Sequence, residues 1–376
     1  MSGPLHGILV ADFSRVLAGP YATMLLADLG ATVIKVEKPG SGDDTRRWSP
    51  PETTEGRATY FESVNRNKRS ITLDLNDHQD RRRAQNLAAK SDIFVENYKV
   101  GALAKFGLDY PAVTTRNPGV IYCSISGFGD KGGRDLPGYD LLVQAMGGLM
   151  SITGEDTPTK VGVALVDVLT GLHASVAMLA ALHERDESGQ GQHVSTNLLS
   201  ALLSSMVNQS TGFTMGGVVP TFLGNAHPSV SPYEVFRCSD QDIVIAVGND
   251  TQFHALCQAL DLDSCMADPR FTSNSERVRH REELARAING QLATHSAQYW
   301  ADLLTAAGVP CGPINNMSQA FALAERLGLN PVIDGHVAHP VTYSRTPADA
   351  YVRAPLLGDS TAAIIEELSL DDLPST

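Results

Sequence analysis

The first third of the chain alternates short apolar runs with segments whose apolar residues recur at helical spacing. Five runs rich in β-branched residues predict strands, at 7–12, 31–37, 70–74, 92–96 and 120–124. Helical spacing predicts helices at 20–30 and 77–90 between them. This order predicts an α/β fold with a parallel sheet that has helices on both faces. In such sheets ligands bind beyond the carboxyl ends of the strands, so we expect functional residues in the loops there.

The pattern becomes mainly helical after residue 140. Apolar segments with few charges predict helices at 141–150, 168–185 and 196–215. Helices this apolar are buried on most sides, which indicates a deep core or a large subunit interface. The longest uninterrupted apolar stretches, such as 174–182, are shorter than the roughly 20 residues that cross a bilayer, so we expect no membrane span.

A second, smaller unit follows a linker rich in glycine, proline and serine. The linker covers 216–232, and short strands at 233–236 and 243–247 precede helices at 252–260 and 275–292. We therefore divide the chain into a large domain at 1–215, a linker with a small α+β domain at 216–325, and a C-terminal segment at 326–376 that returns to the large domain.

Composition narrows the classes of protein to consider. Of the 376 residues, 43% are hydrophobic and 19% are charged, so extensive disorder is not expected. The formal net charge of -13 argues against a nucleic-acid-binding protein, which needs a broad basic face. The five cysteines include no Cys-x-x-Cys pair and no Cys/His cluster with zinc spacing, which predicts reduced thiols and no metal. The N-terminus lacks the features of a signal peptide, and we expect a cytoplasmic protein.

The loops after two of the predicted strands differ in glycine content. After the first strand the chain reads Arg15-Val16-Leu17-Ala18-Gly19-Pro20, without the Gly-x-Gly-x-x-Gly pattern that nicotinamide dinucleotides usually require. The sequence therefore argues against an ordinary nicotinamide-dependent dehydrogenase. Glycines recur at 127, 129, 132 and 133 after the fifth predicted strand. That glycine-rich turn is either a plain connection or a source of backbone amides for a ligand.

The densest group of positive charges lies at 65–69, just before the third predicted strand. Asn65-Arg66-Asn67-Lys68-Arg69 holds three cations in five residues of an acidic chain. It is either a solvated loop or a site for phosphate or carboxylate groups, since arginine offers a bidentate fork and lysine a point charge. Basic residues from neighbouring loops could join it: Lys35, Lys38, Arg46, Arg47 and Lys105.

Asp167 stands between a short apolar run and the long apolar helix predicted at 168–185. It is either an N-cap, whose oxygen accepts the first free amide hydrogens of the helix, or a carboxylate in a dry cleft that acts as nucleophile or base. Asp140 precedes another predicted helix and is a second candidate cap. We interpret His173 and His183 as ordinary core or surface residues of the apolar helix.

Five segments, taken in order along the chain, carry a further signal. They read DFSRVLAGPYATMLLADLGATVIKVEKPGSGDDTR, NRNKRSITLDL, VENYKVGALAKFGL, VDVLTG and RAPLLG. Each segment alone is weakly diagnostic, but the ordered set spans almost the whole chain and resembles the family III CoA-transferases. The resemblance raises the catalytic interpretation of Asp167 above its interpretation as a cap.

The resemblance implies a fold, an assembly and a site. The first and last segments would form a Rossmann-like CoA-binding domain, and two chains would interlock as a homodimer. A CoA thioester would be a substrate, with no tightly bound cofactor, and Asp167 would be the nucleophile. By position, the resemblance implies CoA contacts at Arg15, Val16, Leu17, Ala18, Lys38, Asn67, Lys68, Arg69, Asn97, Tyr98, Lys105 and Tyr139.

Expectations for the acyl groups follow from the same resemblance. Motifs at 225–228, 248–253 and 311–317 resemble the branch of the family that works on succinyl-CoA and glutarate. We therefore expect succinyl-CoA as donor and a dicarboxylic acid as acceptor, with Arg46 or Arg66 on the distal carboxylate and Gly127 near the reacting carbonyl. The glycine-rich loop of formyl-CoA:oxalate members has no counterpart here.

Two other functions stay open at this point. The α-methylacyl-CoA racemases also resemble this chain, but they use a histidine in a Gly-His-Asp triplet, where this chain has Gly138-Tyr139-Asp140. Tyrosine, with an unperturbed pKa of about 10, is a poor base near neutral pH. The second alternative is a non-catalytic CoA-binding protein, which would bind acyl-CoA without forming a covalent adduct.

Overall fold

Two compact units make up the computed structural model, which describes residues 3–348 and 351–372. The first unit contains the chain up to 149, residues 160–218 and the chain from 330 onward. The second unit contains residues 150–159 and 219–329. Part of the C-terminal segment expected at 326–376, namely 349–350 and 373–376, lies outside the described residues.

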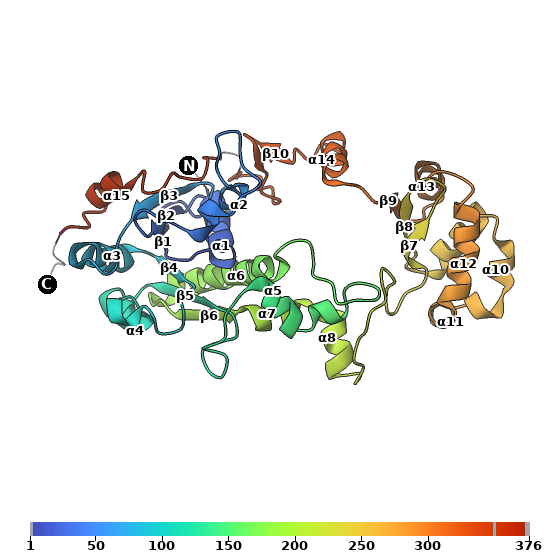
Figure 1. Cartoon of the computed structure of the whole chain (residues 1–376), viewed down its shortest axis with the longest axis horizontal. Helices are drawn as coiled ribbons and strands as arrows, with labels where there is room; N and C mark the ends of the chain where they lie inside the picture. The colour runs from blue at the N-terminus through green and yellow to red at the C-terminus, as the bar shows by residue number, and fades with distance from the viewer. Residues whose placement is uncertain (1–2, 349–350, 373–376) are drawn as a thin grey trace. The chain divides into compact units, whose positions relative to one another are not determined.

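A six-stranded sheet forms the centre of the first unit (Figure 1). Its order is β3-β2-β1-β4-β5-β6, and every neighbouring pair is parallel. The strands are β1 (Leu9–Asp12), β2 (Thr32–Glu37), β3 (Lys68–Thr72), β4 (Ile93–Glu96), β5 (Ile121–Ser126) and β6 (His193–Asn197). The expected α/β fold with a parallel sheet is thereby confirmed. Because the strand order reverses between β1 and β4, a ligand-binding crevice is expected beyond the carboxyl ends of these two strands.

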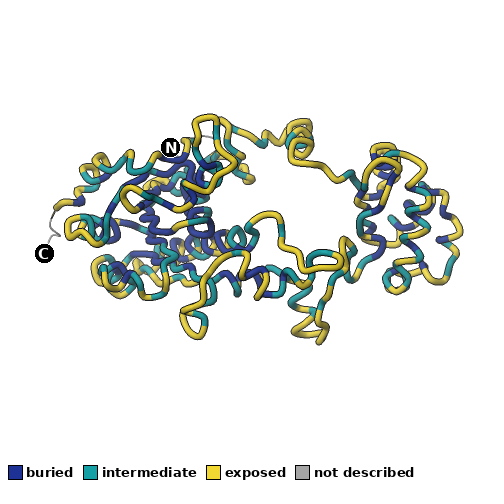
Figure 2. Tube along the Cα trace, viewed as in Figure 1, coloured by how far each residue is buried: buried dark blue, intermediate teal, exposed yellow. Residues whose placement is uncertain are grey.

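Helices surround the sheet and continue beyond it. Those of the first unit are α1 (Ala18–Asp28), η1 (Asp44–Arg47), α2 (Thr59–Ser63), α3 (His78–Lys90), η2 (Ala104–Phe106), α4 (Tyr110–Arg116), α5 (Asp140–Met146), α6 (Leu165–Ser188), α7 (Leu198–Ser205), α8 (Val207–Thr214) and α15 (Thr361–Glu367). The short helix η3 (Leu149–Ser151) follows α5, and the hairpin β10 (Val332–Ile333) and β11 (His336–Val337) precedes α15. The central strands are buried on both sides, with Val10, Phe94 and Val95 fully inaccessible (Figure 2).

The second unit has its own sheet and core. Strands β7 (Tyr233–Arg237), β8 (Asp242–Ala246) and β9 (Cys311–Pro313) are antiparallel. The accompanying helices are α9 (Asp250–Ala259), α10 (Asp263–Ala267), η4 (Pro269–Phe271), α11 (Asn274–Arg279), α12 (Arg281–Leu292), α13 (Ala297–Ala306) and α14 (Met317–Arg326). Phe236, Phe253 and Trp300 are buried in one apolar cluster, so this unit contains a hydrophobic core of its own.

Three predictions of local structure were wrong. Strand β6 was missed, because its sequence His-Val-Ser-Thr-Asn is mostly polar and pairs only at the edge of the sheet. The single helix expected at 196–215 is two helices that meet at Met206, and Val207 has a positive φ of 29°. The surface helix expected at 275–292 is likewise interrupted at His280, between α11 and α12.

Helix α6 is longer than the apolar stretches in the sequence suggested. It has 24 residues, and its most apolar 18-residue window has a mean hydropathy of 1.8, so by length and composition it could cross a membrane. The argument from short apolar stretches was therefore wrong for this segment. In the fold α6 packs along α1 and against β5 and β6, with Ala174, Met178 and Ala181 buried. These contacts pack one side of α6 against the sheet and α1 of the first unit, while Leu172 and Val176 are exposed.

Candidate active site

A pocket of about 450 Å³ opens at the carboxyl ends of β1, β4 and β5, where the strand order reverses. Its walls come from the loops after these strands and from the first residues of α6 and α7. It brings together many of the residues predicted from the sequence: Arg15, Val16, Leu17, Ala18, Asn97, Tyr98, Gly127, Tyr139 and Asp167. The pocket therefore lies where a parallel sheet is expected to bind its ligand.

Asp167 lies in the first turn of α6, not at its N-cap. The N-cap residue is Ala164, which has no side-chain capping bond. The amides of Val166 and Asp167 instead donate to Oδ1 of Asp140, at 2.8 and 3.3 Å. The interpretation of Asp167 as a cap was therefore wrong, and Asp140 caps α6 rather than its own helix α5. Within residues 3–348 and 351–372, the Asp167 carboxylate has no hydrogen-bonding or ion-pair partner.

The environment of Asp167 favours its neutral form. Burial raises the pKa of this carboxyl, and the negative charge of Asp140 raises it further, to about 7. A carboxylate with this pKa is ionised in roughly half of the molecules at neutral pH. Because no cation or amide hydrogen stabilises its charge, the ionised form is a reactive nucleophile or base.

Asp140 also fixes the segment that leads into α6. Its Oδ2 accepts a 2.6 Å hydrogen bond from Nε2 of Gln144, and Oε1 of Gln144 accepts one from the amide of Val161 at 2.9 Å. Gln144 is buried. The carboxylate that raises the pKa of Asp167 is thus held in place by the same contacts that position the start of α6.

The loop between β1 and α1 forms one wall of the pocket and is held by Asn97. The side-chain oxygen of Asn97 accepts from the amide of Arg15 at 2.9 Å, and its Nδ2 donates to the carbonyl of Arg15 at 2.7 Å. The Arg15 guanidinium lies over the ring of Tyr98, 4.8 Å from its centroid. Asn97 therefore joins the loops that follow β1 and β4.

A second pocket, of about 490 Å³, adjoins the first and shares Arg15, Asp44 and Tyr98 with it. Lys38 and Arg47 contribute positive charges to its wall. Lys105, on η2, is exposed, with its Nζ 4.7 Å from the centroid of the Phe106 ring. Phe106 itself lines this second pocket. Exposed cations beside an aromatic ring suit a ligand that carries phosphates and a flat ring system.

The basic cluster at 65–69 does not line the pocket that contains Asp167. Four of its five residues are buried, so the alternative of a solvated loop is wrong. Its charges have carboxylate partners inside the first unit: Arg66 pairs with Asp28 at 2.5 Å, Lys68 with Asp12 at 3.0 Å, and Arg69 with Glu367 at 2.6 Å. Asn67 donates to Asp28 at 2.8 Å.

Two further basic residues that the sequence placed in neighbouring loops, Lys35 on β2 and Arg46 on η1, are paired in the same way. Nε of Arg46 is 2.8 Å and its Nη2 is 2.7 Å from the carboxylate oxygens of Glu37. Lys35, which the sequence suggested as a partner for anionic groups, is fully buried and pairs with Asp43 at 2.9 Å. Arg15, Lys38, Arg47 and Lys105 are therefore better placed to bind a ligand from solution than these two residues are.

The structure adds residues that the sequence did not single out. Gly127 and Gly138 approach so closely that a Cβ on either would overlap the Cα of the other, which joins the loops after β5 and before α5. Burial raises the pKa of the Tyr60 phenol to about 12, and the nearby carboxylate of Asp167 contributes to this rise.

His173 and His183 are exposed on α6. No three His, Cys, Asp or Glu side chains among the described residues lie together as a metal site.

Comparison with known proteins gives matches along almost the whole chain. The model of CoA-transferase family III matches residues 5–361. A succinate–glutarate CoA-transferase of Agrobacterium fabrum is 41% identical over 394 residues, covering 99% of this chain and 98% of that protein. The succinyl-CoA:glutarate CoA-transferase of Homo sapiens is 40% identical, covering 98% of this chain and 87% of that protein. The crystal structure of a CAIB/BAIF family protein from Brucella suis has a TM-score of 0.87 and 39% identity, covering 98% of this chain and 100% of that chain.

Proposed function

This chain belongs to CoA-transferase family III and is a CoA-transferase, and we propose that it moves CoA from succinyl-CoA to glutarate or a dicarboxylic acid of similar length. The names of two relatives at 40–41% identity, which this chain matches over nearly its whole length, support these substrates. The observation that carries the chemistry is the unpaired, largely buried carboxylate of Asp167 in a pocket at the carboxyl ends of the strands.

Asp167 is proposed to act as a nucleophile in two rounds of acyl exchange. Its carboxylate attacks the succinyl-CoA carbonyl, which forms a mixed anhydride and releases the CoA thiolate. The thiolate then attacks the aspartyl carbonyl, which releases succinate and leaves CoA as a thioester of Asp167. The acceptor carboxylate repeats these steps in reverse, forming an acceptor–Asp167 anhydride and then the new CoA thioester. Each bond formed resembles in energy the one broken, so the protein supplies position, dryness and oxyanion stabilisation.

We propose CoA contacts at the cations and loops that remain accessible. Arg15 to Ala18, Asn97, Tyr98 and Tyr139 line the same pocket as Asp167. The neighbouring pocket, with Lys38 and near Lys105, would receive the phosphates and adenine. Gly127 lines the Asp167 pocket and remains the proposed source of an amide for the oxyanion. Because their polar groups are used within the fold, Arg46 and the cluster at 66–69 are left out of this proposal.

A homodimer forms part of the proposal, with the interlocked arrangement implied by the family. Large apolar side chains are exposed along α5 to α8 of the described chain, among them Met146, Val176, Val207 and Phe213. Apolar side chains exposed together on consecutive helices are typical of a surface that a partner covers. A second copy of the chain would bury them.

A screen of acyl donors and carboxylic acid acceptors, with products identified by mass spectrometry, tests the proposal. We expect transfer from succinyl-CoA to glutarate, and hydroxylamine added with acyl-CoA should convert Asp167 to its hydroxamate. Asp167→Asn should lose both reactions. Asp186→Asn, an exposed carboxylate at the other end of α6, should keep both.

Two other outcomes would reject the transferase mechanism. Deuterium uptake at the α-carbon of an acyl-CoA without acyl exchange would indicate a racemase, although Tyr139 stands where those enzymes have their histidine. Tight binding of acyl-CoA with no covalent adduct at Asp167 would indicate a binding protein. Either result would contradict the role proposed for Asp167.

A further inference from the structure

The loop from Ser14 to Leu17, which forms a wall of the Asp167 pocket, has a backbone conformation that its sequence does not favour. Val16 has a φ of 70°, in the left-handed region that β-branched residues rarely adopt. Helix α1 begins directly after this loop, and its N-cap residue Leu17 has no side-chain capping bond. Contacts with other parts of the chain must therefore hold the loop in this shape.

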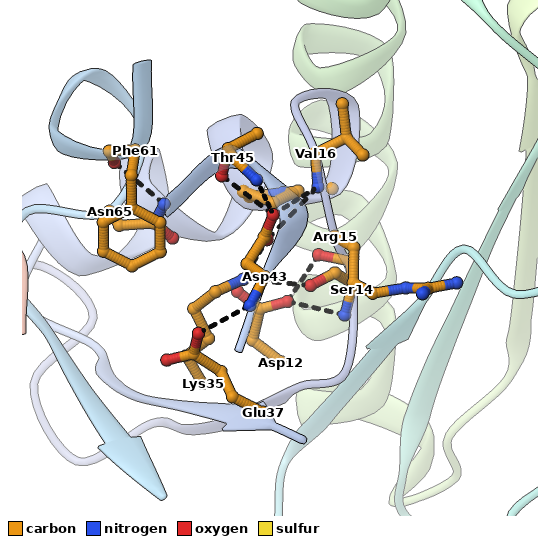
Figure 3. Close-up of polar contacts among 12 residues, drawn as sticks. Asp12, Ser14, Arg15, Val16, Lys35, Glu37, Asp43, Thr45, Phe61 and Asn65 are labelled. Atoms are coloured by element: carbon orange, nitrogen blue, oxygen red, sulfur yellow. Dashed lines mark hydrogen bonds and ion pairs between the residues drawn. The ribbon is translucent and has the colours of Figure 1, made fainter. Parts of the chain in front are cut away.

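A buried carboxylate–ammonium pair supplies the contact to Val16 and one to Ser14 (Figure 3), beside those that Asn97 makes with Arg15 and Asp12 with Ser14. The amide of Val16 donates to the Asp43 carboxylate, at 3.2 Å to Oδ2 and 3.4 Å to Oδ1. Nζ of Lys35 donates to Oδ2 of Asp43 at 2.9 Å and to the carbonyl of Ser14 at 3.1 Å. The side chains of Lys35 and Asp43 are both fully buried. The pair thus holds one amide and one carbonyl of the loop at once.

The pair is held by its own neighbours. Oδ1 of Asp43 accepts from the amide of Thr45 at 3.0 Å and from its hydroxyl at 2.8 Å. The amide of Asp43 donates to Glu37 at 3.0 Å, and Glu37 pairs with Arg46. Burial would raise the pKa of the Asp43 carboxyl, but Lys35 and the Thr45 hydrogen bonds hold it below its ordinary value. Asp43 therefore stays ionised at neutral pH, as the Val16 contact requires.

We propose that Lys35 and Asp43 are positioning residues of the transfer reaction, which hold the Val16 loop in the shape that aligns the acyl-CoA thioester with Asp167. This inference rests on the function proposed above. Both residues border the second pocket, but their side chains are fully buried, so the proposed role acts through the backbone of the loop and requires no contact with the substrate. Misplacing the reacting groups by about 1 Å can slow an enzyme by about 10²-fold. If Lys35 and Asp43 have this role, replacing either residue should slow the attachment of CoA to Asp167 more than its effect on stability explains.

A second buried ion pair provides a matched control. Arg66 and Asp28 lie 2.5 Å apart with side-chain exposures of 7% and 0%, and Asp28 also accepts from Asn67. Neither Arg66 nor Asp28 lines the Asp167 pocket or contacts the loop from Ser14 to Leu17. Asp28→Asn and Asp43→Asn thus make the same chemical change, in two buried pairs, at two places in the first unit.

The test measures the single-turnover rate at which CoA becomes attached to Asp167 of the full-length enzyme, together with denaturant unfolding. We expect Asp43→Asn to slow attachment by about 10²-fold, while Asp28→Asn loses comparable stability and keeps the wild-type rate. Equal rates in wild type and Asp43→Asn, or equal slowing by both variants, would overturn the inference. Absence of the adduct in the wild-type enzyme would instead overturn the proposed function.

A milder variant covers the case in which Asp43→Asn does not fold. Thr45→Val removes one hydrogen bond to Asp43 but keeps the shape of the side chain and leaves every charge paired. We expect it to slow attachment several-fold and to change the affinity for free CoA much less, because the loop carries Arg15 while Lys38 and Lys105 lie outside it. A wild-type rate in folded Thr45→Val would count against the inference.

Discussion

Replacing Asp140 by asparagine should lower the pKa of Asp167 and move the pH dependence of CoA attachment towards acid. Asparagine keeps an oxygen that can accept from the amide of Val166, so the start of α6 stays capped. It removes the negative charge that, after burial, is the second cause of the raised pKa of Asp167. One hydrogen bond, from Gln144, is lost in the exchange.

The size of the effect follows from the two causes. The pKa of Asp167 rises from 3.8 to about 7, and Asp140 is the smaller contribution. Removing it should therefore recover less than half of this rise, about 1 unit or about 1.4 kcal/mol. At pH 6 the ionised fraction of Asp167 would increase from about one tenth to about one half. Because the ionised form is the nucleophile, the wild-type reaction rate should rise with pH through about 7, and that of the variant through about 6.

The assay is the pH profile of kcat/KM for transfer from succinyl-CoA, since this quantity reports the ionisations of the free enzyme. Gln144→Leu is the control, because it breaks the same hydrogen bond, together with the one from the amide of Val161, and leaves Asp140 charged. Its profile should keep the wild-type midpoint. An unchanged or more alkaline midpoint in Asp140→Asn, or an equal displacement in Gln144→Leu, would refute the reasoning.

Three further predictions concern the stability of the nucleophile, a glycine contact and the assembly. Asp167→Asn should stabilise the fold above pH 7, because wild type must ionise a buried carboxyl there. The raised pKa corresponds to roughly 4 kcal/mol. Because the side chain is partly exposed, we expect a gain in unfolding free energy of only about 1–2 kcal/mol. The pKa of Asp167 is raised in the folded state, so wild type loses stability as the pH rises from about 4 to about 7. Urea unfolding should therefore show equal stability of wild type and variant at about pH 4. Gly127→Ala should destabilise the fold and slow transfer, measured by calorimetry and by rate, because its Cβ would overlap Gly138; an unaltered rate would contradict this. Dilution in the ultracentrifuge should yield no folded monomer, and a stable monomer would count against the dimer.

The sheet was predictable because its strands are buried on both faces. Continuous apolar runs such as those around Val10 and Phe94 have no polar alternative, and five strands were located within a few residues. Strand β6 lacks this signal because it lies at the edge of the sheet, where its polar side chains do not oppose pairing. The local pattern of apolar residues thus identified the buried strands. It missed β6, whose pairing depends on β5 beside it and not on its own sequence.

The site was only partly predictable, because its electrostatics depend on contacts between distant residues. Asp167 has the local pattern of a helix cap, and only the fold shows that Asp140, 27 residues away, supplies the cap instead. Likewise, the basic cluster at 65–69 resembles an anion site until its partners are known, and Asp28 and Glu367 come from distant segments. Charge density along a sequence therefore indicates a requirement for opposite charge, but not whether a ligand or the protein meets it.

Lys35 did carry a recognisable local signal. It interrupts an apolar run that forms a strand buried in the sheet, and a buried ammonium requires a carboxylate partner. Stability alone does not explain such a pair, since apolar residues of similar volume are often as stabilising in a core. Apolar side chains at positions 35 and 43 could not, however, accept from the amide of Val16 or donate to the carbonyl of Ser14. The polar pair is therefore best explained by the loop that it holds beside the nucleophile.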